Sequence, residues 1–551
     1  MMVMLLVPSH INQYDRDVFL FFIGSAQMLS LAILSSLLCL TLHTCHGGKV
    51  LVYPVEGSHW VNMNILIEGL HSKGHDITVL RSDKSWYIKE NSSSYNTITV
   101  PVSASLDEEF IAKIVTETIN IQRGHSSLFV FVTLLVEMFK KLKEAHVTLK
   151  EMIVNILENP ELIKSLQDCH YDILLTDPCW GGGTVLAHYL HLPLVYNVRW
   201  LPVGEGHFAV APSPVSYIPL TGSGFSDKMT FIERVKNMLY FGAVVIQDRL
   251  TLRPVYQGVC EKYLSPHSDF YMLMQSADLW LMRGDFVFEF PRPTMPNVVY
   301  MGGFQCKPAK PLPQDLEDFV QSSGEHGVIL MSLGTFVSQL PSDITEEIAA
   351  AFAELPQKVI WKYTGERPST LGNNTLLVDW MPQNDILGHP KIKLFVAHGG
   401  TNGVQEALYH GVPVVGIPLF FDQYDNLLRL KVRGGATILS VATLEKGTLL
   451  QGLQEVLREP SYRENMQRLS RLHRDQPVKP LDRALFWIEF VMRHKGAAHL
   501  RTESYKMPWY AYHSVDVVLF LVAVLSLIVL IIFAVIRYLL RLCNKIKNKV
   551  D

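Results

Sequence analysis

The stretch FVAHGGTNGVQEALYHGVPVVGIPLFFDQYDN occupies residues 395–426. An apolar run ends at His398, two glycines turn the chain, and a helical segment follows from about Asn402 to His410. A glycine turn that opens a helix exposes backbone N–H groups and the positive end of the helix dipole, which suits a phosphate. The chain has neither G-x-x-x-x-G-K nor G-x-G-x-x-G here, so the turn is not a P-loop and lacks the dinucleotide fingerprint.

Strand-like and helical segments alternate on both sides of this motif. KVLVYPV (49–55), a helical segment and DITVL (76–80) form a β-α-β unit, which favours a parallel sheet. Apolar or strand-like runs continue as YDILLTD, LPLVYN and FYMLMQSADLWLM, and later as GVILMSLGT, VIWKY, LLVDW, LFVAH and VVGIP. Between the two sets, CKPAKPLPQD (306–315) has three prolines and predicts a semi-rigid linker. We expect two open α/β sheets that face a cleft, with ligands at the carboxyl ends of the strands.

Polar side chains follow the predicted strands in an order that matches the parts of a nucleotide sugar. Trp380 could stack on a base, and Gln383 could contact it. Glu406, one turn into the helix, could accept hydrogen bonds from a ribose. Asp422 and Gln423 offer a carboxylate and an amide to sugar hydroxyls. An ordinary cluster of α/β turns explains the same spacing, so the residues alone leave both explanations open.

The composition indicates membrane segments. Of 551 residues, 48% are hydrophobic and only 18% are charged. The apolar stretch 18–42 predicts a cleaved secretory signal, with an uncleaved signal anchor as the alternative. Residues 517–536 contain no charge and are long enough to cross a bilayer core of about 30 Å. The basic tail 537–551 is then cytosolic, and the rest of the mature chain lies on the other side of the membrane.

Short motifs near the end and within the chain point to the endoplasmic reticulum. The final KNKVD places Lys547 and Lys549 as in a dilysine retrieval signal, although a plain basic flank has the same composition. Asn91 and Asn373 begin N-x-[ST] glycosylation sequons, which are usable only if this region is lumenal. We therefore expect a single-pass type I protein of the endoplasmic reticulum membrane, with lumenal domains.

Charge and cysteine spacing exclude other classes. The net charge of −3 gives no reason to expect a nucleic-acid partner. The cysteines between the signal and the anchor show no C-x-x-C spacing, so we predict neither a zinc site nor a disulfide framework.

The run WMPQNDILGHPKIKLFVAHGGTNGVQEALYHGVPVVGIPLFFDQYDN (380–426) resembles the signature of the UDP-glycosyltransferases. More narrowly, the chain is similar to the membrane-bound UDP-glucuronosyltransferases of animals. GSHW, MGGFQCKPAKPLPQDLEDFVQSSGEHGVILMSLGT, QPVKPLDRALFWIEFVMRHKGAAHL and the terminal anchor extend the likeness over essentially the whole chain after the signal. The resemblance implies a GT-B fold of two Rossmann-like α/β domains, with the UDP-sugar held by the C-terminal half and an apolar acceptor by the N-terminal half.

This resemblance and the composition together divide the chain. We expect a signal peptide (1–46), an acceptor-binding Rossmann-like domain (47–305), the Pro-rich linker (306–315), a UDP-sugar-binding Rossmann-like domain (316–475), a return helix with a juxtamembrane segment (476–516), a transmembrane helix (517–536) and a basic tail (537–551).

The resemblance also implies roles for individual residues. Trp380 would stack on uracil with Gln383 near the uridine, and Glu406 would bind the ribose. Asp422 and Gln423 would bind the sugar. The diphosphate would be held by Ser332, Thr335, His398, Gly400, Asn402 and Gly403.

Two positions depart from the family pattern near the donor. Ala397 stands where Thr or Ser is usual, and Tyr424 stands where Pro is usual. Both departures lie next to predicted donor contacts, so a donor sugar other than glucuronate stays open as an alternative.

Transfer to a hydroxyl needs a base for the acceptor proton and a stabilised leaving diphosphate. His59 and Asp177 each follow a predicted strand, where a turn or cap residue is the ordinary explanation. The resemblance implies instead that His59 is the base and Asp177 orients it, so that attack opposite UDP inverts the anomeric carbon. Arg283 is the candidate contact for a glucuronate carboxylate, because arginine pairs with carboxylates in bidentate fashion.

No protein-bound metal or other cofactor is implied, and UDP-glucuronate is the expected co-substrate. Glycosyltransferases of the other common fold bind a metal through D-x-D, and the only such motif here, Asp15–Asp17, precedes the signal core. The helix N-terminus at 399–403 and His398 can neutralise the diphosphate instead.

Several alternatives remain at this point. The same fold could use UDP-glucose, UDP-galactose or UDP-xylose. The chain could instead be a non-catalytic partner that forms hetero-oligomers with related transferases and modulates them. The enzyme itself could also form homo- or hetero-oligomers with related transferases. The expected acceptors are small lipophilic molecules such as phenols and steroids, selected near residues 129–139 and 198–217. LFVFVTLLVEMF (128–139) fits a buried core helix or an interfacial patch, and we expect the core helix. The return helix is expected to pack on the N-terminal domain.

Overall fold

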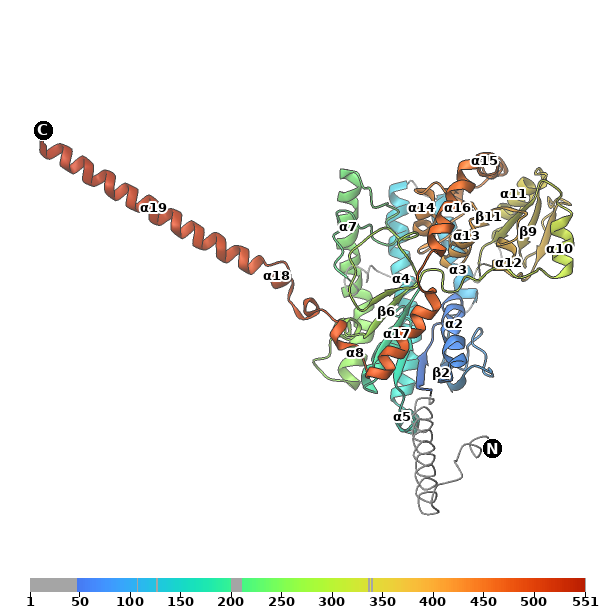
Figure 1. Cartoon of the computed structure of the whole chain (residues 1–551), viewed down its shortest axis with the longest axis horizontal. Helices are drawn as coiled ribbons and strands as arrows, with labels where there is room; N and C mark the ends of the chain where they lie inside the picture. The colour runs from blue at the N-terminus through green and yellow to red at the C-terminus, as the bar shows by residue number, and fades with distance from the viewer. Residues whose placement is uncertain are drawn as a thin grey trace, which may run out of the picture.

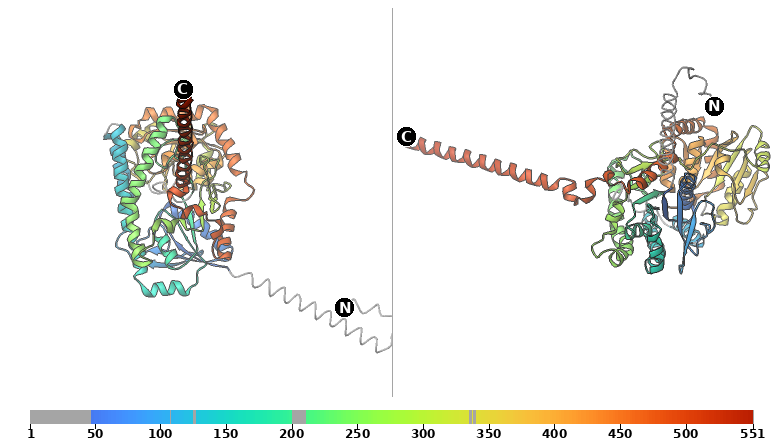
Figure 2. Two further views of the ribbon diagram at one scale, coloured as in Figure 1. Left: turned by 90° about the vertical axis from the view of Figure 1, so that its left-hand side faces the viewer. Right: turned by 60° about the horizontal axis from the view of Figure 1, so that its bottom comes forward.

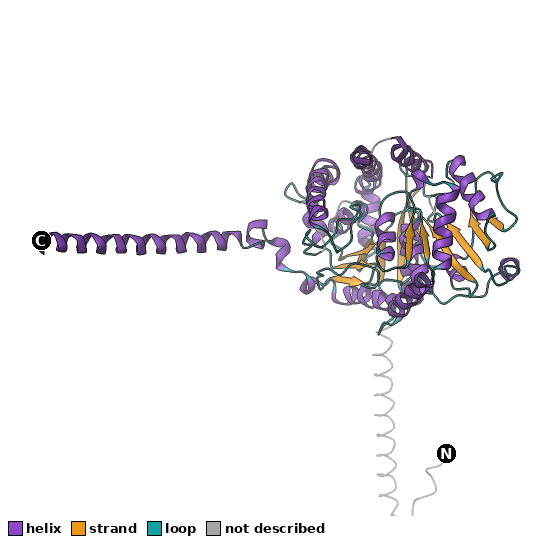
Figure 3. Ribbon diagram, turned by 90° about the horizontal axis from the view of Figure 1, so that it is seen from above, coloured by secondary structure: helices purple, strands orange, loops and turns teal. Residues whose placement is uncertain are grey.

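The computed structural model describes residues 47–106, 108–124, 127–199, 211–334, 337 and 340–550. The predicted signal peptide and Thr335 lie outside these residues. Two parallel sheets lie side by side, with helices on both faces of each (Figures 1 and 3).

The first sheet has seven strands in the order β3-β2-β1-β4-β5-β6-β7. Their bounds are β1 Lys49–Tyr53, β2 Asp76–Ser82, β3 Asn96–Val100, β4 Ile173–Thr176, β5 Leu194–Val198, β6 Leu279–Met282 and β7 Val298–Tyr300. Its helical segments are α2 Ser58–Ser72, α3 Glu108–Gly124, α4 Ser127–Leu157, α5 Pro160–Asp168, α6 Gly182–Tyr189, α7 Phe231–Gln247, η3 Asp248–Leu252, α8 Arg253–Tyr263 and α9 Phe270–Gln275. Every residue of β4 and β5 is buried, as expected for parallel strands covered on both faces.

The second sheet has six strands in the order β10-β9-β8-β11-β12-β13. They are β8 Val328–Ser332, β9 Lys358–Lys362, β10 Thr375–Val378, β11 Ile392–Ala397, β12 Val414–Gly416 and β13 Ala436–Ile438. Its helical segments are α10 Gln314–Gln321, α11 Ser342–Ala353, α12 Gln383–Leu387, α13 Thr401–His410, α14 Gln423–Lys431, η4 Val441–Thr443, α15 Lys446–Arg458 and α16 Pro460–Arg474. Both sheets follow the 3-2-1-4-5-6 order of Rossmann domains, which confirms the predicted pair of Rossmann-like domains.

In each sheet the strand order reverses between the first strand and its partner on the other side, at β1/β4 and at β8/β11. Side chains that follow these strands diverge from the sheet and leave a crevice, which is where ligands bind in open α/β sheets. His59 and Asp177 follow β1 and β4, whereas Ser332 and His398 end β8 and follow β11. The topology alone therefore places these four residues at two crevices.

After the second domain, the chain returns to the first. Helix α17 (Pro480–His494) packs on α2, and its inner residues Ala484, Leu485, Ile488, Val491 and Met492 belong to the same core cluster as β1. A Cβ added at Gly69 of α2 would lie 2.9 Å from Leu485 Cδ1, so this glycine allows the two helices to approach closely. Glu489 accepts hydrogen bonds from Lys73 at 2.9 Å and His75 at 3.2 Å.

The short segments η5 (Ala498–Leu500), η6 (Glu503–Lys506) and α18 (Trp509–Tyr512) lead into α19 (Val515–Val550). Residues Val515–Ile546 of α19 are long and apolar enough to cross a membrane, and none of this span is buried. Figure 1 shows α19 extending away from the body, as expected for an anchor. The backbone of Lys547 and Lys549 continues this helix, and their side chains lie outside the described part.

Helix α3 of the first half reaches the second domain. Val115 and Ile119 are buried in the core cluster of the second sheet, and Arg123 forms an ion pair with Asp343 at 2.8 Å. Helix α3 of the first half thus packs on the second domain, whereas α17, which follows the second domain, packs on the first.

One local prediction was wrong, and another segment divides into two elements. The stretch 128–139 is not a buried core helix: it forms part of α4, and among its described side chains Val132 and Val136 are 52% and 44% exposed. The run FYMLMQSADLWLM, expected as a strand or an apolar segment, contains both α9 and the strand β6. The Asp269 carboxylate accepts hydrogen bonds from the Tyr271 and Met272 N–H groups and caps the helix.

Truncating α17 tests its contribution to the first domain. Ile488→Ala should lower the free energy of unfolding of the full chain in detergent by about 2–5 kcal/mol, because it removes a fully buried side chain. Phe486→Ala on the same helix, at a half-exposed position, should cost less than about 1 kcal/mol. Urea denaturation measures both, and equal losses would contradict the packing of α17 in this core.

Candidate active site

One cavity of about 650 Å³ lies between the two halves. The residues that line it come mainly from the turns that follow the carboxyl ends of strands in both sheets. From the first half they include Glu56, Ser58, His59, Cys179, Trp180 and Arg199, and from the second half Ser332, Lys362, Trp380, Gln383, His398, Gly400, Asn402, Gly403, Glu406, Asp422 and Gln423. The described candidates for donor binding thus surround the same space as His59.

His59 and Asp177 form a buried pair at the first crevice. His59 lies in the first turn of α2, after a sharp turn at Gly57, whose φ is 66°. Its Nδ1 lies 2.7 Å from Asp177 Oδ2, and the other carboxylate oxygen accepts the Cys179 N–H at 2.9 Å. The two side chains are 10% and 1% exposed. Asp177 therefore has a fixed orientation and in turn fixes the imidazole.

The surroundings favour a neutral imidazole at His59. Burial lowers its pKa, Asp177 opposes this effect, and the positive charges of Arg199 and Arg283 lower the pKa further. A neutral imidazole that donates its Nδ1–H to Asp177 keeps a lone pair on Nε2. His59 is thus in the protonation state that a general base requires.

At the second crevice, the glycine turn brings backbone close to the start of α13. Gly399 has a φ of 93°, and a Cβ there would lie 2.4 Å from the Gln423 carbonyl oxygen. A Cβ at Gly400 would lie 2.4 Å from His398 Nε2. Burial, with the charge of Arg199, lowers the pKa of His398 to about 4, so this imidazole is also neutral. The turn can therefore pack against the start of α14 and the His398 ring only because both positions lack side chains.

Asn402 joins the two halves at the centre of the site. Its Oδ1 accepts hydrogen bonds from Asn62 Nδ2 at 2.9 Å and from Arg283 Nη2 at 2.6 Å, and both donors belong to the first half. Arg283 follows β6 and is 2% exposed, and its Nε and Nη1 have no hydrogen-bond partner. Burial lowers its pKa to about 9. Arg283 lies behind Asn402 and is not among the residues that line the cavity.

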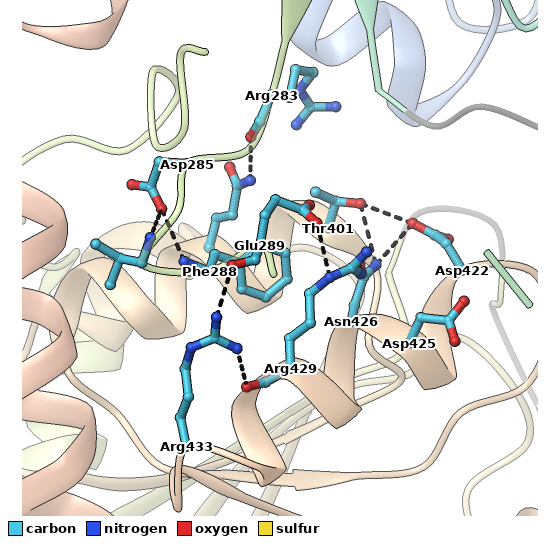
Figure 4. A network of polar contacts seen from close by, with 12 residues as sticks. Arg283, Asp285, Phe288, Glu289, Thr401, Asp422, Asp425, Asn426, Arg429 and Arg433 are labelled. Atoms are coloured by element: carbon cyan, nitrogen blue, oxygen red, sulfur yellow. Dashed lines mark hydrogen bonds and ion pairs between the residues drawn. The ribbon is translucent and has the colours of Figure 1, made fainter. Parts of the chain in front are cut away.

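The turn that carries Asp422 and Gln423, the predicted sugar contacts, is held by a compact polar network (Figure 4). We call this turn the sugar motif. Asp422 Oδ2 accepts from Thr401 Oγ1 at 3.0 Å and from Asn426 Nδ2 at 2.8 Å. Gln423 Oε1 accepts from the Leu419 and Phe420 N–H groups, so only its Nε2 is left to meet a ligand. These bonds orient both side chains before a donor arrives.

The first half also reaches this motif. Arg429 of α14 pairs with Glu289 at 2.9 Å, as Figure 4 shows. Asp425 accepts the Gly222 N–H at 2.5 Å and the Gly224 N–H at 3.2 Å, and burial raises its pKa to about 6. The ring of Tyr424 lies next to Gly224. A loop of the first domain therefore closes the rim beside the sugar motif.

At the far end of the donor side, Trp380 is 73% exposed and forms an open aromatic platform at the cavity edge. Gln383 Nε2 donates to Glu406 Oε2 at 2.6 Å. Burial raises the pKa of Glu406 to about 7.

The similarity of this chain to known proteins agrees with the geometry of the site. A model of the family "UDP-glucoronosyl and UDP-glucosyl transferase" matches residues 48–550. The chain belongs to this family. It is 42% identical over 513 residues to UDP-glucuronosyltransferase 2A1 of Mus musculus, covering 92% of this chain and 96% of the relative. It is 44% identical over 506 residues to UDP-glucuronosyltransferase 2B1 of Rattus norvegicus, covering 91% and 94%.

Solved structures confirm the GT-B fold of this UDP-glycosyltransferase family member. A UDP-glucosyltransferase from Polygonum tinctorium aligns with a TM-score of 0.54 at 17% identity over 82% of this chain and all of its own. The calicheamicin glycosyltransferase CalG4 aligns with a TM-score of 0.54 at 16% identity, over 81% and 98%.

In this family member, the rest of the cavity is largely apolar. Its walls include side chains from α3 and α4 and from the segments after β2 and β3: Tyr87, Ile88, Leu106, Phe110, Ile114, Met138, Leu142, Ala145, Leu149 and Met152. Among the described residues of the first half, the charged side chains that line the cavity are Glu56, Lys141 and Arg199. Burial raises the pKa of Glu56.

Some residues of the candidate site were not predicted from the sequence. Arg199 directly follows β5 and lines the cavity, so the rule that selected His59 and Asp177 at strand ends applies to it as well. Asn62 and Asp425 act through contacts between the halves, for which the sequence has no local signal.

Three ligand atoms from His59, Asp177 and Cys179 lie within 4.8 Å of one another and could hold a metal ion. The charges of Arg199 and Arg283 act on His59 and oppose a cation there. The residues therefore fit a base with its carboxylate better than a metal centre.

The raised pKa of Glu406 predicts a pH-dependent stability. A carboxyl group whose folded-state pKa is raised contributes stability that is complete below the unfolded pKa, near 4.3, and is lost as the pH rises through about 7. From pH 4 to pH 8, wild type should lose up to about 3 kcal/mol of unfolding free energy relative to Glu406→Gln. Urea denaturation across this range measures the difference. The control Glu366→Gln changes an exposed position, so its unfolding free energy should depend on pH in the same way as that of wild type. If the unfolding free energy of Glu406→Gln also followed the wild-type pH dependence, the raised pKa of Glu406 would be contradicted.

Proposed function

We propose that the chain is an inverting transferase that moves glucuronate from UDP-glucuronate to a hydroxyl of small lipophilic acceptors. The observation that carries this proposal is the buried His59–Asp177 pair, because its His59 lines the same cavity as the α13 glycine turn. The two relatives described above are named UDP-glucuronosyltransferases, which supports glucuronate as the sugar.

The donor would lie along the second crevice. Trp380 would stack on uracil, with Gln383 near the uridine, and the carboxyl group of Glu406 would accept from the ribose hydroxyls. The diphosphate would meet His398, the N-terminus of α13 at 400–403 and Ser332, with Thr335 as a further contact outside the described part. Asp422 and the Nε2 of Gln423 would bind the sugar hydroxyls.

The acceptor would occupy the apolar side of the cavity with its hydroxyl at His59 Nε2. As the acceptor oxygen attacks the anomeric carbon, its O–H bond breaks and the proton passes to Nε2. The bond from the anomeric carbon to the diphosphate breaks on the opposite face, and UDP leaves with the electron pair. Asp177 stabilises the resulting imidazolium. The α-linked donor thus becomes a β-glucuronide.

Two arginines, Arg283 and Arg199, are candidates for the contact with the glucuronate carboxylate. The unpartnered Nε and Nη1 of Arg283 favour an anion nearby, because buried polar groups rarely lack partners. Because Arg283 lies behind Asn402, it can reach the carboxylate only if the Asn402 side chain moves aside or forms a hydrogen-bond bridge between the two. Arg199 lines the cavity directly. We assign the carboxylate contact to Arg283, with Arg199 as the alternative.

We further propose a type I topology in the endoplasmic reticulum, with a signal peptide at 1–46, lumenal domains, and retrieval through Lys547 and Lys549. Both sequon residues, Asn91 and Asn373, are exposed, which is compatible with glycosylation. Endoglycosidase digestion of the chain made in cells tests the lumenal placement.

The second candidate is the same reaction with a neutral UDP-sugar. The family description includes UDP-glucosyl transfer, and Tyr424 changes the rim of the donor-sugar side.

The catalytic pair can be tested with labelled donors. In permeabilised microsomes given phenols and steroids, His59→Ala should reduce conjugate formation at least about 100-fold, as expected for removal of a general base. Asp177→Asn should also lower kcat strongly while UDP affinity stays unchanged, because both residues lie on the acceptor side. Full activity of His59→Ala would overturn the mechanism. Measurable UDP binding without any conjugate in wild type would favour the non-catalytic partner.

Donor choice separates the two arginines. Arg283→Gln should raise the KM for UDP-glucuronate at least 10-fold more than the KM for UDP-glucose, because a neutral sugar has no carboxylate to lose. The matched variant Arg199→Gln should lack this discrimination. The opposite result would transfer the role to Arg199, and conjugates from neutral sugars alone in wild type would replace glucuronate as the donor.

A further inference from the structure

Helix α7 carries its apolar side chains on the outside. Seven large apolar residues of α7 and the following turn of η3 are 41–70% exposed: Phe231, Ile232, Val235, Met238, Leu239, Ile246 and Leu250. At 100° per residue the six positions in α7 fall on one side of the helix, and Leu250 extends this side into the π-helical η3, beside the exposed Arg249. We call this set of apolar residues the α7 stripe. A patch of this kind on a water-soluble surface marks an interaction site.

The inner side of the same helix is partly polar. Asn237 is fully buried, and its side chain donates to the Val215 and Ile218 carbonyl oxygens and accepts from the Leu220 N–H. Gln247 is 4% exposed and also faces inward. This arrangement reverses the usual pattern of a surface helix in water, whose apolar side faces the core. The outward side of α7 is therefore suited to a medium other than water.

The position of α7 identifies that medium. Helices α7, η3 and α8 form one continuous run, and the chain leaves the body for α18 and α19 next to α8 (Figure 1). Figure 1 also shows α7 along the edge of the body from which α19 extends. In the left view of Figure 2, α7 (green) runs along the face from which α19 projects toward the viewer. Helix α7 and the membrane-spanning candidate thus belong to the same side of the molecule.

Basic residues border the stripe. By helical spacing, Arg234 and Lys236 lie just outside its two edges, and both are exposed. The Arg234 guanidinium lies 5.8 Å from the centre of the Phe231 ring. An apolar stripe between two cationic edges is the pattern of a helix that lies in the interface of a bilayer, with its cations toward the lipid phosphates.

We propose that α7 is a second membrane contact of this chain. Its stripe lies against the lipid acyl chains, and Arg234 and Lys236 point to the headgroups. The body is thereby held flat on the membrane rather than hanging from α19 alone.

Depth-dependent quenching tests this contact in the full chain. Cys543, which is exposed, is replaced by serine, and an environment-sensitive fluorophore is attached at Leu239→Cys after reconstitution into phosphatidylcholine vesicles. The matched control carries the fluorophore at Asp315→Cys on α10, on the opposite side of the body from α19 (Figure 1). With spin-labelled acyl chains, quenching at position 239 should exceed that at position 315 at least 3-fold.

A second variant keeps the test sharp. Replacing Ile246 and Leu250 by glutamine should lower the quenching at position 239 at least 2-fold, while UDP binding reports that the chain is still folded. Equal, weak quenching at positions 239 and 315 would overturn the proposal. So would energy transfer between copies of the chain at position 239 without lipid quenching, because the stripe would then bind a second copy.

Discussion

The reversal of strand order at β1/β4 and at β8/β11 is the constraint on which the rest of the site depends. A parallel sheet sends every chain segment off its carboxyl edge in the same direction, and only at the reversal do two neighbouring segments separate. His59 and Asp177 come from the two strands at the first reversal, so a residue pair 118 positions apart meets at 2.7 Å. His398 and Ser332 come from the second. The chemistry requires that these two edges face each other, and the remaining contacts serve that arrangement.

Contacts between the halves are concentrated where catalysis would need them. Asn402 accepts from Asn62 and Arg283, Asp425 accepts from the loop at Gly222, and Glu289 meets α14. Each bond joins the acceptor half to a residue beside the donor motif. Because several of these groups are buried, separating the halves exposes them together. The two crevices are therefore linked through the same side chains.

The sequence was a good guide to whatever depends on local order along the chain. The glycine turn, the strand ends at His59 and Asp177, and the two sheets follow from periodicity and turn chemistry, and the family resemblance supplied the roles. The sequence was a poor guide to the direction in which a helix face or a side chain points. The same apolar spacing fits a helix that faces a core and one that lies partly at the surface, so the stretch 128–139 was placed wrongly. Arg283 follows a strand like Arg199, yet only Arg199 lines the cavity, because the sequence does not specify how far each side chain turns.

The position of α17 has a consequence for how the molecule is made. Its residues 480–494 complete a core that begins at β1, residues 49–53, so the first domain lacks part of its interior until nearly the whole chain exists. At about 5–20 residues per second, synthesis leaves the surface of α2 around Gly69 uncovered for roughly 20–90 s. The second domain is finished earlier, at α16, and folds beside an incomplete neighbour. In this chain the domain that is synthesised first is the domain that matures last.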